Sequence, residues 1–185
     1  LESEHDSFVL GHTGTSISLA CGLAKTRDMQ HTAAGASEIG NVIAIIGDGS
    51  LSSAIAFEGL NNAAEQGGNL IIVVNDNEMS IAEDFGGMYG NLARLRASNG
   101  TAELNLFKAF GLDYRYVEQG NDVDTLVAAL EDLKDIDHPV VLHIHTTKGL
   151  GFSDETEAQD GSDGCNQTNP QPHAGQCEAN HWQDP

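Results

Sequence analysis

Basic residues are scarce in this chain of 185 residues, which has 8 lysines and arginines against 28 aspartates and glutamates. The formal net charge of −20 at pH 7 repels polyanions, which argues against nucleic acid and anionic membrane surfaces as partners. A bound phosphate group would therefore depend on a metal ion and on helix dipoles rather than on a basic patch.

Cysteines and long apolar runs are also few. Cys21, Cys165 and Cys177 form an odd, sparse set, which suits a reducing compartment better than a disulfide scaffold. No apolar run approaches the roughly 20 residues of a membrane span, and no signal peptide precedes the first motif. We therefore expect a cytoplasmic protein that does not enter membranes. Because the chain begins at Leu1 rather than Met, we expect a fragment of a longer protein.

The centre of the chain predicts a strand, a helix and a second strand. Residues 42–46 and 70–74 are short apolar runs, as expected of strands buried on both faces, and residues 50–66 predict one helix between them. The strands end at two polar turns, GDG at 47–49 and NDN at 75–77. Parallel strands joined by a crossover helix place both turns at one sheet edge. We predict an α/β domain with a mainly parallel sheet and helices on both faces.

The two polar turns carry the candidate site, because α/β proteins bind ligands at the carboxyl edge of the sheet. Free N–H groups at Gly49, Ser50 and Leu51 would favour an anion such as phosphate. The Asp48 carboxylate points to the same place, and with the Asn77 amide oxygen it offers hard ligands for Mg²⁺. We predict a magnesium-diphosphate site, although each turn alone could be an ordinary turn.

Four motifs lie in order within residues 3–152: GHTGTSIS, GDGSLSSAIAFEGLNNA, IIVVNDNEMSIAEDFGGMYG and VLHIHTTKGLGF. Together they resemble the 1-deoxy-D-xylulose-5-phosphate synthase family, which is transketolase-like. The resemblance implies a thiamine-diphosphate-binding fold with thiamine diphosphate and Mg²⁺ as cofactors. It implies a transferase that decarboxylates pyruvate and transfers the two-carbon unit to glyceraldehyde 3-phosphate, for isoprenoid and thiamine biosynthesis. It also implies a homodimer for the full-length enzyme.

The resemblance assigns cofactor contacts to residues near both ends of the matched region. Gly11, His12 and Thr13 correspond to a turn that contacts the cofactor, and His12 is the catalytic candidate. Phe152 corresponds to an aromatic side chain that packs against the cofactor. On its own, His12 could be a turn histidine bonded to the backbone, and Phe152 an ordinary hydrophobic anchor. The sequence departs from the family at Thr13 and Gly14, where serines are more usual.

The resemblance also completes the predicted metal site. Asp48, Asn77 and the backbone carbonyl of Met79 would be the protein ligands of Mg²⁺. Asp48, Gly49 and Ser50 would contact the cofactor at its diphosphate, together with Asn77. A backbone carbonyl requires no particular side chain, so Met79 could also be simply a core residue.

Outside the centre, we expect helices at residues 17–24, 91–96, 102–110 and 123–133, and strands at residues 114–117 and 140–146. Asn121 or Asp122 would cap the helix at 123–133, whose valines and leucines would all face the core. We expect a surface loop at 26–40 and, at 78–90, a loop folded against the active site. His143 and His145 project to the same side of their strand and could hold a metal, but we favour hydrogen-bonded core residues.

The end of the chain has a different composition. Residues 153–185 contain no Lys or Arg and little apolar periodicity, so we expect an acidic, polar linker or tail after a domain at 1–152. Cys165, His173, Cys177 and His181 could form a zinc set, but their spacing matches this poorly. In the resembling family a second domain follows and carries the carboxylate that activates the cofactor. We therefore expect these 185 residues alone to be inactive.

Two other functional classes stay open. The chain could be a transketolase-like half-site subunit or a non-catalytic cofactor-binding module. It could also be a metal-dependent phosphohydrolase with Asp48 as the nucleophile, although Ser50 stands where such sites often have a second acid.

Overall fold

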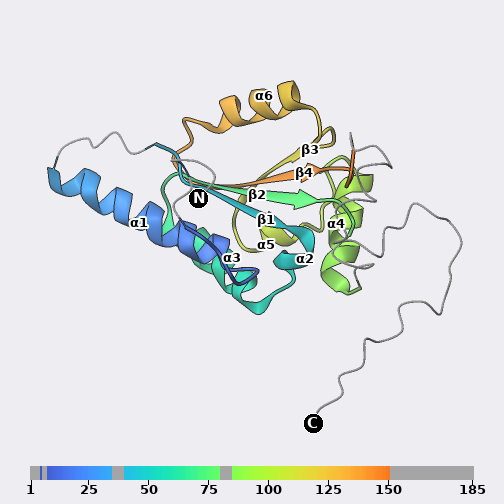
Figure 1. Cartoon of the computed structure of the whole chain (residues 1–185), viewed down its shortest axis with the longest axis horizontal. Helices are drawn as coiled ribbons and strands as arrows, with labels where there is room; N and C mark the ends of the chain where they lie inside the picture. Colours follow the sequence, from blue (N-terminus) through green and yellow to red (C-terminus); the bar gives the residue numbers. More distant parts are fainter. Residues whose placement is uncertain (1–4, 6–7, 35–39, 80–84, 151–185) are drawn as a thin grey trace, which may run out of the picture. The chain divides into compact units, whose positions relative to one another are not determined.

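The computed structural model describes residues 5, 8–34, 40–79 and 85–150 (Figure 1). The chain divides into two compact units, Leu1–Lys148 and Gly149–Pro185, and of the second only Gly149 and Leu150 are described. The domain boundary expected after residue 152 stays a prediction. None of the helices in the described ranges is long and apolar enough to cross a membrane.

The first unit alternates helices with parallel strands. Its elements are α1 (Ser16–Ala34), β1 (Ile43–Gly47), α2 (Asp48–Leu51), α3 (Ala54–Gln66), β2 (Leu70–Asp76), α4 (Gly87–Ala97), α5 (Leu106–Ala109), β3 (Asp113–Val117), α6 (Val123–Leu133) and β4 (Pro139–His145). The four strands form one sheet in the order β1-β2-β4-β3, and every pair is parallel. The predicted α/β class with a parallel sheet is confirmed.

Helices cover both faces of this sheet, as predicted. One core cluster contains Leu70, Ile72 and Val74 of β2 and the apolar sides of α1, α3, α4 and α5. The alternate residues of β2, Ile71 and Val73, lie in a second cluster under α6. Figure 1 shows α6 on the opposite side of the sheet from α1, α3 and α5. The sheet is therefore the middle of three layers, and β2 is buried on both faces.

The expectation that the first strand is also buried on both faces is wrong. Ile43 and Ile45 of β1 are 46% and 67% exposed, whereas Ala44 and Ile46 are buried. The reason is that β1 is an edge strand and α6 packs over β3 at the other end of the sheet. The valines of α6 differ from expectation in a similar way, since Val123 is 69% exposed. Leu133 of α6 is buried, and Asp122 caps this helix as expected, accepting from the Thr125 amide.

The surface loop expected at residues 26–40 is wrong over 26–34, because α1 continues to Ala34. Arg27 explains the extension. Its side chain is nearly buried and donates from Nη2 to the Asn69 carbonyl at 2.8 Å, which ties the second half of α1 to the residue before β2. This contact is tertiary, so local composition did not signal it.

Two other predicted helices have different bounds. The helix expected at 50–66 is interrupted, because Ser53 accepts a hydrogen bond from the Ala56 amide and starts α3 anew. The helix expected at 102–110 is reduced to α5, because Asn105 caps it with bonds from the Phe107 and Lys108 amides. Of the loop expected at 78–90, residues 87–90 belong to α4, and residues 80–84 lie outside the described residues.

Candidate functional site

The two polar turns meet at one edge of the sheet, as predicted from the topology. Gly47 at the end of β1 is paired with Asn75 near the end of β2. Asp48 then starts α2 and is only 3% exposed. Its Oδ1 accepts a hydrogen bond from the main-chain N–H of Gly49 at 2.8 Å, and its Oδ2 accepts one from the main-chain N–H of Asn77 at 3.2 Å. One carboxylate therefore joins the two turns.

The residues from Asn77 to Met79 form a tight turn that holds the other two predicted metal ligands. Asn77 Oδ1 accepts from the Met79 amide at 3.2 Å. Between them, Glu78 has a left-handed backbone with φ of 65°, which few residues other than glycine adopt. Asp48, Asn77 and Met79 are thus neighbours, and their oxygens are a carboxylate, an amide and a backbone carbonyl, all hard donors. Their role as metal ligands stays a prediction.

The main-chain N–H groups of Gly49, Ser50 and Leu51, which we expected to be free at the start of a long helix, are arranged differently. The helix they begin, α2, has only four residues. The Gly49 N–H donates to Asp48 rather than pointing out of the turn. The Ser52 hydroxyl donates to the Gly49 carbonyl at 2.8 Å and closes this short helix. The Leu51 N–H makes the first hydrogen bond within α2, so Ser50 is the remaining candidate for an amide that binds a phosphate.

A pocket of about 200 Å³ lies beside the end of β1. It is lined by Leu10, Gly11, His12, Thr13, Gly14, Ser16, Ile45, Ile46, Gly47 and Ser50. The structure thus brings the predicted cofactor contacts Gly11, His12 and Thr13 to Ser50. Asp48, Gly49 and Asn77 are not among the lining residues, so the metal ligands adjoin this pocket rather than line it.

A close backbone approach holds the loop at residues 11–14 in place. Gly14 has φ of 85°, and a Cβ atom there would overlap the Ser53 hydroxyl at the start of α3. A serine, the more usual residue in the family that the sequence resembles, would not fit this backbone. The bare backbone at residue 14 is therefore what lets the loop pack against α3.

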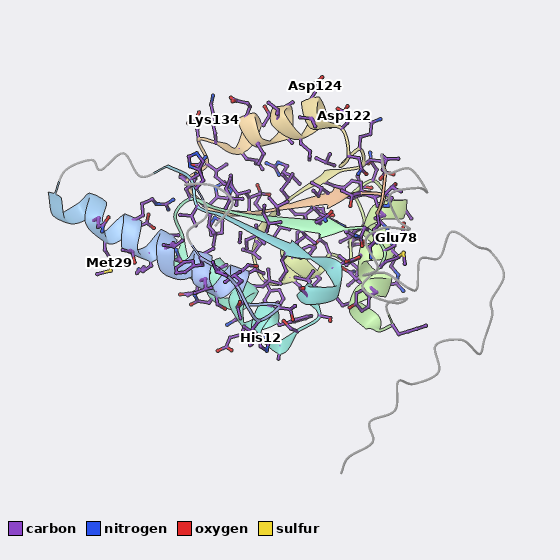
Figure 2. The ribbon with its side chains drawn as sticks, in the orientation of Figure 1. His12, Met29, Glu78, Asp122, Asp124 and Lys134 are labelled. Carbon is purple, nitrogen blue, oxygen red and sulfur yellow. The ribbon has the colours of Figure 1, made fainter. Side chains whose placement is uncertain are left out.

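His12 adopts the backbone-bonded arrangement that was the alternative to a cofactor contact. Its Nδ1 lies 2.8 Å from the Thr13 carbonyl oxygen, and the Thr15 hydroxyl donates to the His12 carbonyl at 2.9 Å. The side chain is exposed at the mouth of the loop. In Figure 2, His12 lies near α3, whereas Glu78 lies beside α4, where it contacts Arg96. Contact between His12 and a cofactor stays a prediction.

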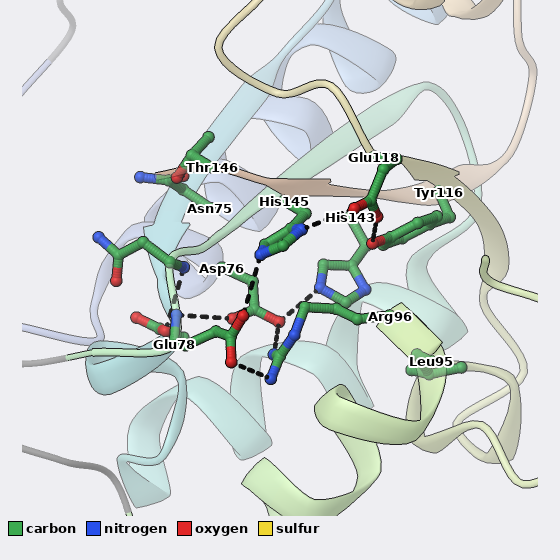
Figure 3. A network of polar contacts seen from close by, with 12 residues as sticks. Asn75, Asp76, Glu78, Leu95, Arg96, Tyr116, Glu118, His143, His145 and Thr146 are labelled. Carbon is green, nitrogen blue, oxygen red and sulfur yellow. Dashed lines mark hydrogen bonds and ion pairs between the residues drawn. The ribbon is translucent and has the colours of Figure 1, made fainter. Parts of the chain in front are cut away.

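A buried polar network lies behind the NDN turn, and sequence analysis missed it (Figure 3). Asp76 is 0% exposed, and its Oδ2 accepts from Arg96 Nη1 at 2.5 Å and from His143 Nε2 at 2.9 Å. Burial raises the pKa of Asp76, but the bonds from His143 and Arg96 outweigh it and lower the pKa to about 2. Asp76 is therefore charged at neutral pH.

The two histidines of β4 have separate surroundings. His143 is fully buried, and its Nδ1 lies 2.7 Å from the Tyr114 hydroxyl, so the favoured interpretation as a hydrogen-bonded core residue is confirmed. Burial and the Asp76 charge raise the pKa of Tyr114, which keeps its hydroxyl protonated. His145 lies at the rim, 3.1 Å from Glu78 Oε1 and 3.2 Å from Glu118 Oε1.

The network could be found in the sequence only in part. Asp76 is the last residue of the buried strand β2, and a carboxylate at such a position is a signal for a paired carboxylate. Arg96 gives no such signal, because its contact depends on how α4 packs. Within the described ranges, no group of three or more His, Cys, Asp or Glu side chains is arranged to hold a metal ion. Phe152 lies outside the described residues, and so do Cys165, His173, Cys177 and His181, the zinc set that the spacing disfavours.

Comparisons with known proteins agree with this fold and these motifs. The family model described as 1-deoxy-D-xylulose-5-phosphate synthase matches residues 1–105 and 98–146. The synthase of Stutzerimonas stutzeri is 34% identical over 83% of this chain and 28% of its own length. Synthase 1 of Geobacter metallireducens is 36% identical over 82% of this chain and 29% of its own length. The chain thus spans less than a third of these curated relatives.

Two solved structures with a similar fold are transketolases. One from Pichia stipitis has a TM-score of 0.58 and 21% identity, over 76% of this chain and 20% of that protein. One from Campylobacter jejuni has a TM-score of 0.55 and 22% identity, over 75% of this chain and 21% of that protein. At this level of identity, the comparison establishes the fold alone.

Proposed function

The chain belongs to the 1-deoxy-D-xylulose-5-phosphate synthase family, and from this premise we propose that it binds the Mg²⁺ and diphosphate of thiamine diphosphate. The observation that carries the proposal is the junction of the two polar turns. Asp48 lies after one parallel strand and Asn77 after the next. The Asp48 carboxylate accepts a hydrogen bond from the main-chain N–H of Asn77 at 3.2 Å. The two residues are therefore direct neighbours.

The donor chemistry of this junction fits a magnesium ion. Mg²⁺ prefers oxygen ligands and usually keeps several positions for phosphate oxygens and water. Asp48 would supply the charged ligand, Asn77 the amide oxygen and Met79 the backbone carbonyl. A carboxylate oxygen can accept a hydrogen bond and coordinate a cation at the same time, so the bonds from the main-chain N–H groups of Gly49 and Asn77 do not by themselves exclude a metal ion at Asp48.

The pocket beside β1 fits the other end of such a ligand. Ser50 lines it and belongs to α2, which begins with Asp48, so the pocket adjoins the proposed metal ligands. Gly11, His12 and Thr13 also line it and would contact the cofactor there. The Ser50 amide would bind the diphosphate, with the metal ion compensating the negative charge of the protein.

The activity of the whole protein follows the family. We propose that it decarboxylates pyruvate and transfers the two-carbon unit to glyceraldehyde 3-phosphate, which gives 1-deoxy-D-xylulose 5-phosphate. Bound thiamine diphosphate supplies the nucleophile and the electron sink for this reaction. The residues of this chain bind and orient the diphosphate end of the cofactor. The remainder of a full-length protein would supply the activating carboxylate, in a cytoplasmic homodimer that serves isoprenoid and thiamine biosynthesis.

The test is the affinity of the full-length protein for thiamine diphosphate, measured by calorimetry with and without Mg²⁺. Asp48→Ala should abolish the Mg²⁺-dependent part of binding, because the diphosphate then faces an acidic protein without a charged metal ligand. Asp124→Ala is the matched control, since it removes the same charge from an exposed position on α6 (Figure 2). Wild-type affinity in Asp48→Ala would remove Asp48 from the site and overturn the proposal.

A further inference from the structure

Arg96 contacts the residues on both sides of Asn77. Its Nη1 lies 2.5 Å from Asp76 Oδ2, and its Nη2 lies 3.1 Å from Glu78 Oε2 (Figure 3). The flat guanidinium group presents these two nitrogens in a fixed geometry, so one side chain sets the separation of two carboxylates. The residue between those carboxylates is the proposed metal ligand Asn77.

The two carboxylates of this bridge are anchored differently. Asp76 is fully buried and also accepts from His143, so it belongs to the core of the sheet. The Glu78 side chain is 54% exposed. Its amide donates to Asp76 Oδ1 at 3.1 Å, and its backbone is left-handed. Arg96 and Asp76 together therefore hold Glu78 in a conformation that it would seldom adopt alone.

The helix that carries Arg96, α4, is anchored in the hydrophobic core. Leu92 and Leu95 of α4 are 1% and 0% exposed and pack in the main core cluster. The Arg96 side chain itself is 14% exposed, and its single positive charge is outnumbered by the two carboxylates that it contacts. The cluster therefore has a net negative charge and does not repel a cation bound beside it.

We propose that Arg96 is a positioning residue for the metal: it fixes the turn at residues 76–79 so that Asn77 and Met79 present their oxygens to Mg²⁺. This inference rests on the proposed function of the same edge. In other metal sites, removing a residue that orients a ligand costs about 10- to 100-fold in metal affinity. We expect a change of that size for Arg96.

The experiment compares Arg96→Met with Arg94→Met in the full-length protein. Arg94 lies on the same helix and is exposed, so its replacement removes an equal charge without touching the turn. Turnover is measured as Mg²⁺ is titrated at saturating thiamine diphosphate. Arg96→Met should raise the half-saturating Mg²⁺ concentration about 10-fold or more, with turnover at saturating Mg²⁺ recovering to within about 2-fold of wild type. Arg94→Met should leave both unchanged.

Two results would overturn the inference. One is the same half-saturating Mg²⁺ concentration in Arg96→Met and Arg94→Met. The other is a loss of turnover that excess Mg²⁺ does not restore, which would mean general damage. Glu78→Ala removes the contact of Arg96 with residue 78 but keeps its buried pair with Asp76, so it tests the bridge in a protein whose core is intact. It should also raise the Mg²⁺ requirement, and wild-type behaviour would refute the two-sided bridge.

A second readout separates this inference from the proposed function. Amide hydrogen exchange at residues 77–79 should be faster in Arg96→Met than in Arg94→Met, without any ligand present. If Asp48→Ala keeps its Mg²⁺ dependence, the proposed function fails and the metal role of Arg96 fails with it. If Asp48→Ala loses Mg²⁺ dependence but Arg96→Met behaves as wild type in both assays, only the inference about Arg96 is wrong.

Discussion

Replacing Asp76 by alanine should destabilise the domain far more than replacing a more exposed aspartate of the same sheet. Asp76 is 0% exposed and accepts from Arg96, from His143 and from the Glu78 amide. The alanine variant removes all three acceptor contacts at once. The variant also takes away the closest charged partner of Arg96. This loss is costly because the Arg96 side chain is only 14% exposed, so water compensates its charge poorly.

The magnitude follows from these contacts. Removing one partner of a buried ion pair costs about 3 to 5 kcal/mol, because the other charge is left uncompensated. Arg96 keeps its contact with Glu78, and His143 keeps the Tyr114 hydroxyl, so we expect the lower end, about 3 kcal/mol. With a urea dependence of about 2 kcal/mol per molar, the unfolding midpoint should fall by about 1.5 M.

The assay is urea unfolding followed by circular dichroism, with Asp113→Ala as the control. Asp113 begins β3 and pairs at 3.0 Å with Arg115, whose side chain is 57% exposed. Exposed pairs contribute about 0 to 1 kcal/mol, so this midpoint should fall by less than about 0.5 M. Equal shifts in the two variants would refute the reasoning, because burial would then have no part in the cost.

The pKa of Asp76 determines how the difference in unfolding free energy between wild type and Asp76→Ala depends on pH. Burial raises this pKa, but the bonds from His143 and Arg96 lower it overall, from 3.8 to about 2. A carboxyl whose pKa is lowered by folding contributes stability above its unfolded pKa and loses it as the pH falls towards the folded value. The stability difference between wild type and Asp76→Ala should be constant near neutral pH and shrink between about pH 4 and pH 2.

Three more predictions concern the proposed ligand-binding edge and the activity of the chain. Asn77→Asp should weaken thiamine diphosphate binding in calorimetry, because it adds a carboxylate beside the diphosphate. If Asn77→Asp binds as wild type and Asn75→Ala loses affinity instead, Asn75 rather than Asn77 is the ligand. Gly14→Ala should cost about 1 to 3 kcal/mol in thermal unfolding, since φ is 85° and a Cβ would overlap Ser53, whereas Gly11→Ala meets no atom within 4 Å and should be neutral. The 185-residue chain alone should release no carbon dioxide from pyruvate and glyceraldehyde 3-phosphate, unlike a full-length protein; comparable rates would place the activating carboxylate within this chain.

The strands could be predicted from sequence better than their surroundings. The apolar run of β2 and the rules for parallel crossovers were enough to place the two polar turns at one edge. A run of five apolar residues looks the same in a central strand and in an edge strand, so the exposure of Ile43 and Ile45 could not be predicted. The length of α1 depends on the bond from Arg27 to Asn69, 42 positions away in the chain.

The candidate site shows the same division. Asp48 and Asn77 could be brought together by topology alone, because each follows a strand of the same crossover unit. The interruption at Ser53 and the use of the Gly49 amide by Asp48 depend on side-chain bonds within a few residues. Arg96 lies 20 positions from Asp76, and only the packing of α4 brings its guanidinium to the turn. No local pattern encodes that contact.

The position of β4 has a consequence for how the protein is made on the ribosome. The last strand of the sheet to be synthesised is inserted between β2 and β3, so residues 139–145 complete the sheet in its interior. Until they emerge, β2 and β3 have no common partner, and the buried Asp76 carboxylate lacks His143. The interior of this sheet and the surroundings of Asp76 therefore stay incomplete until residues 139–145 emerge, and the edges of β2 and β3 that will face β4 stay unpaired until then.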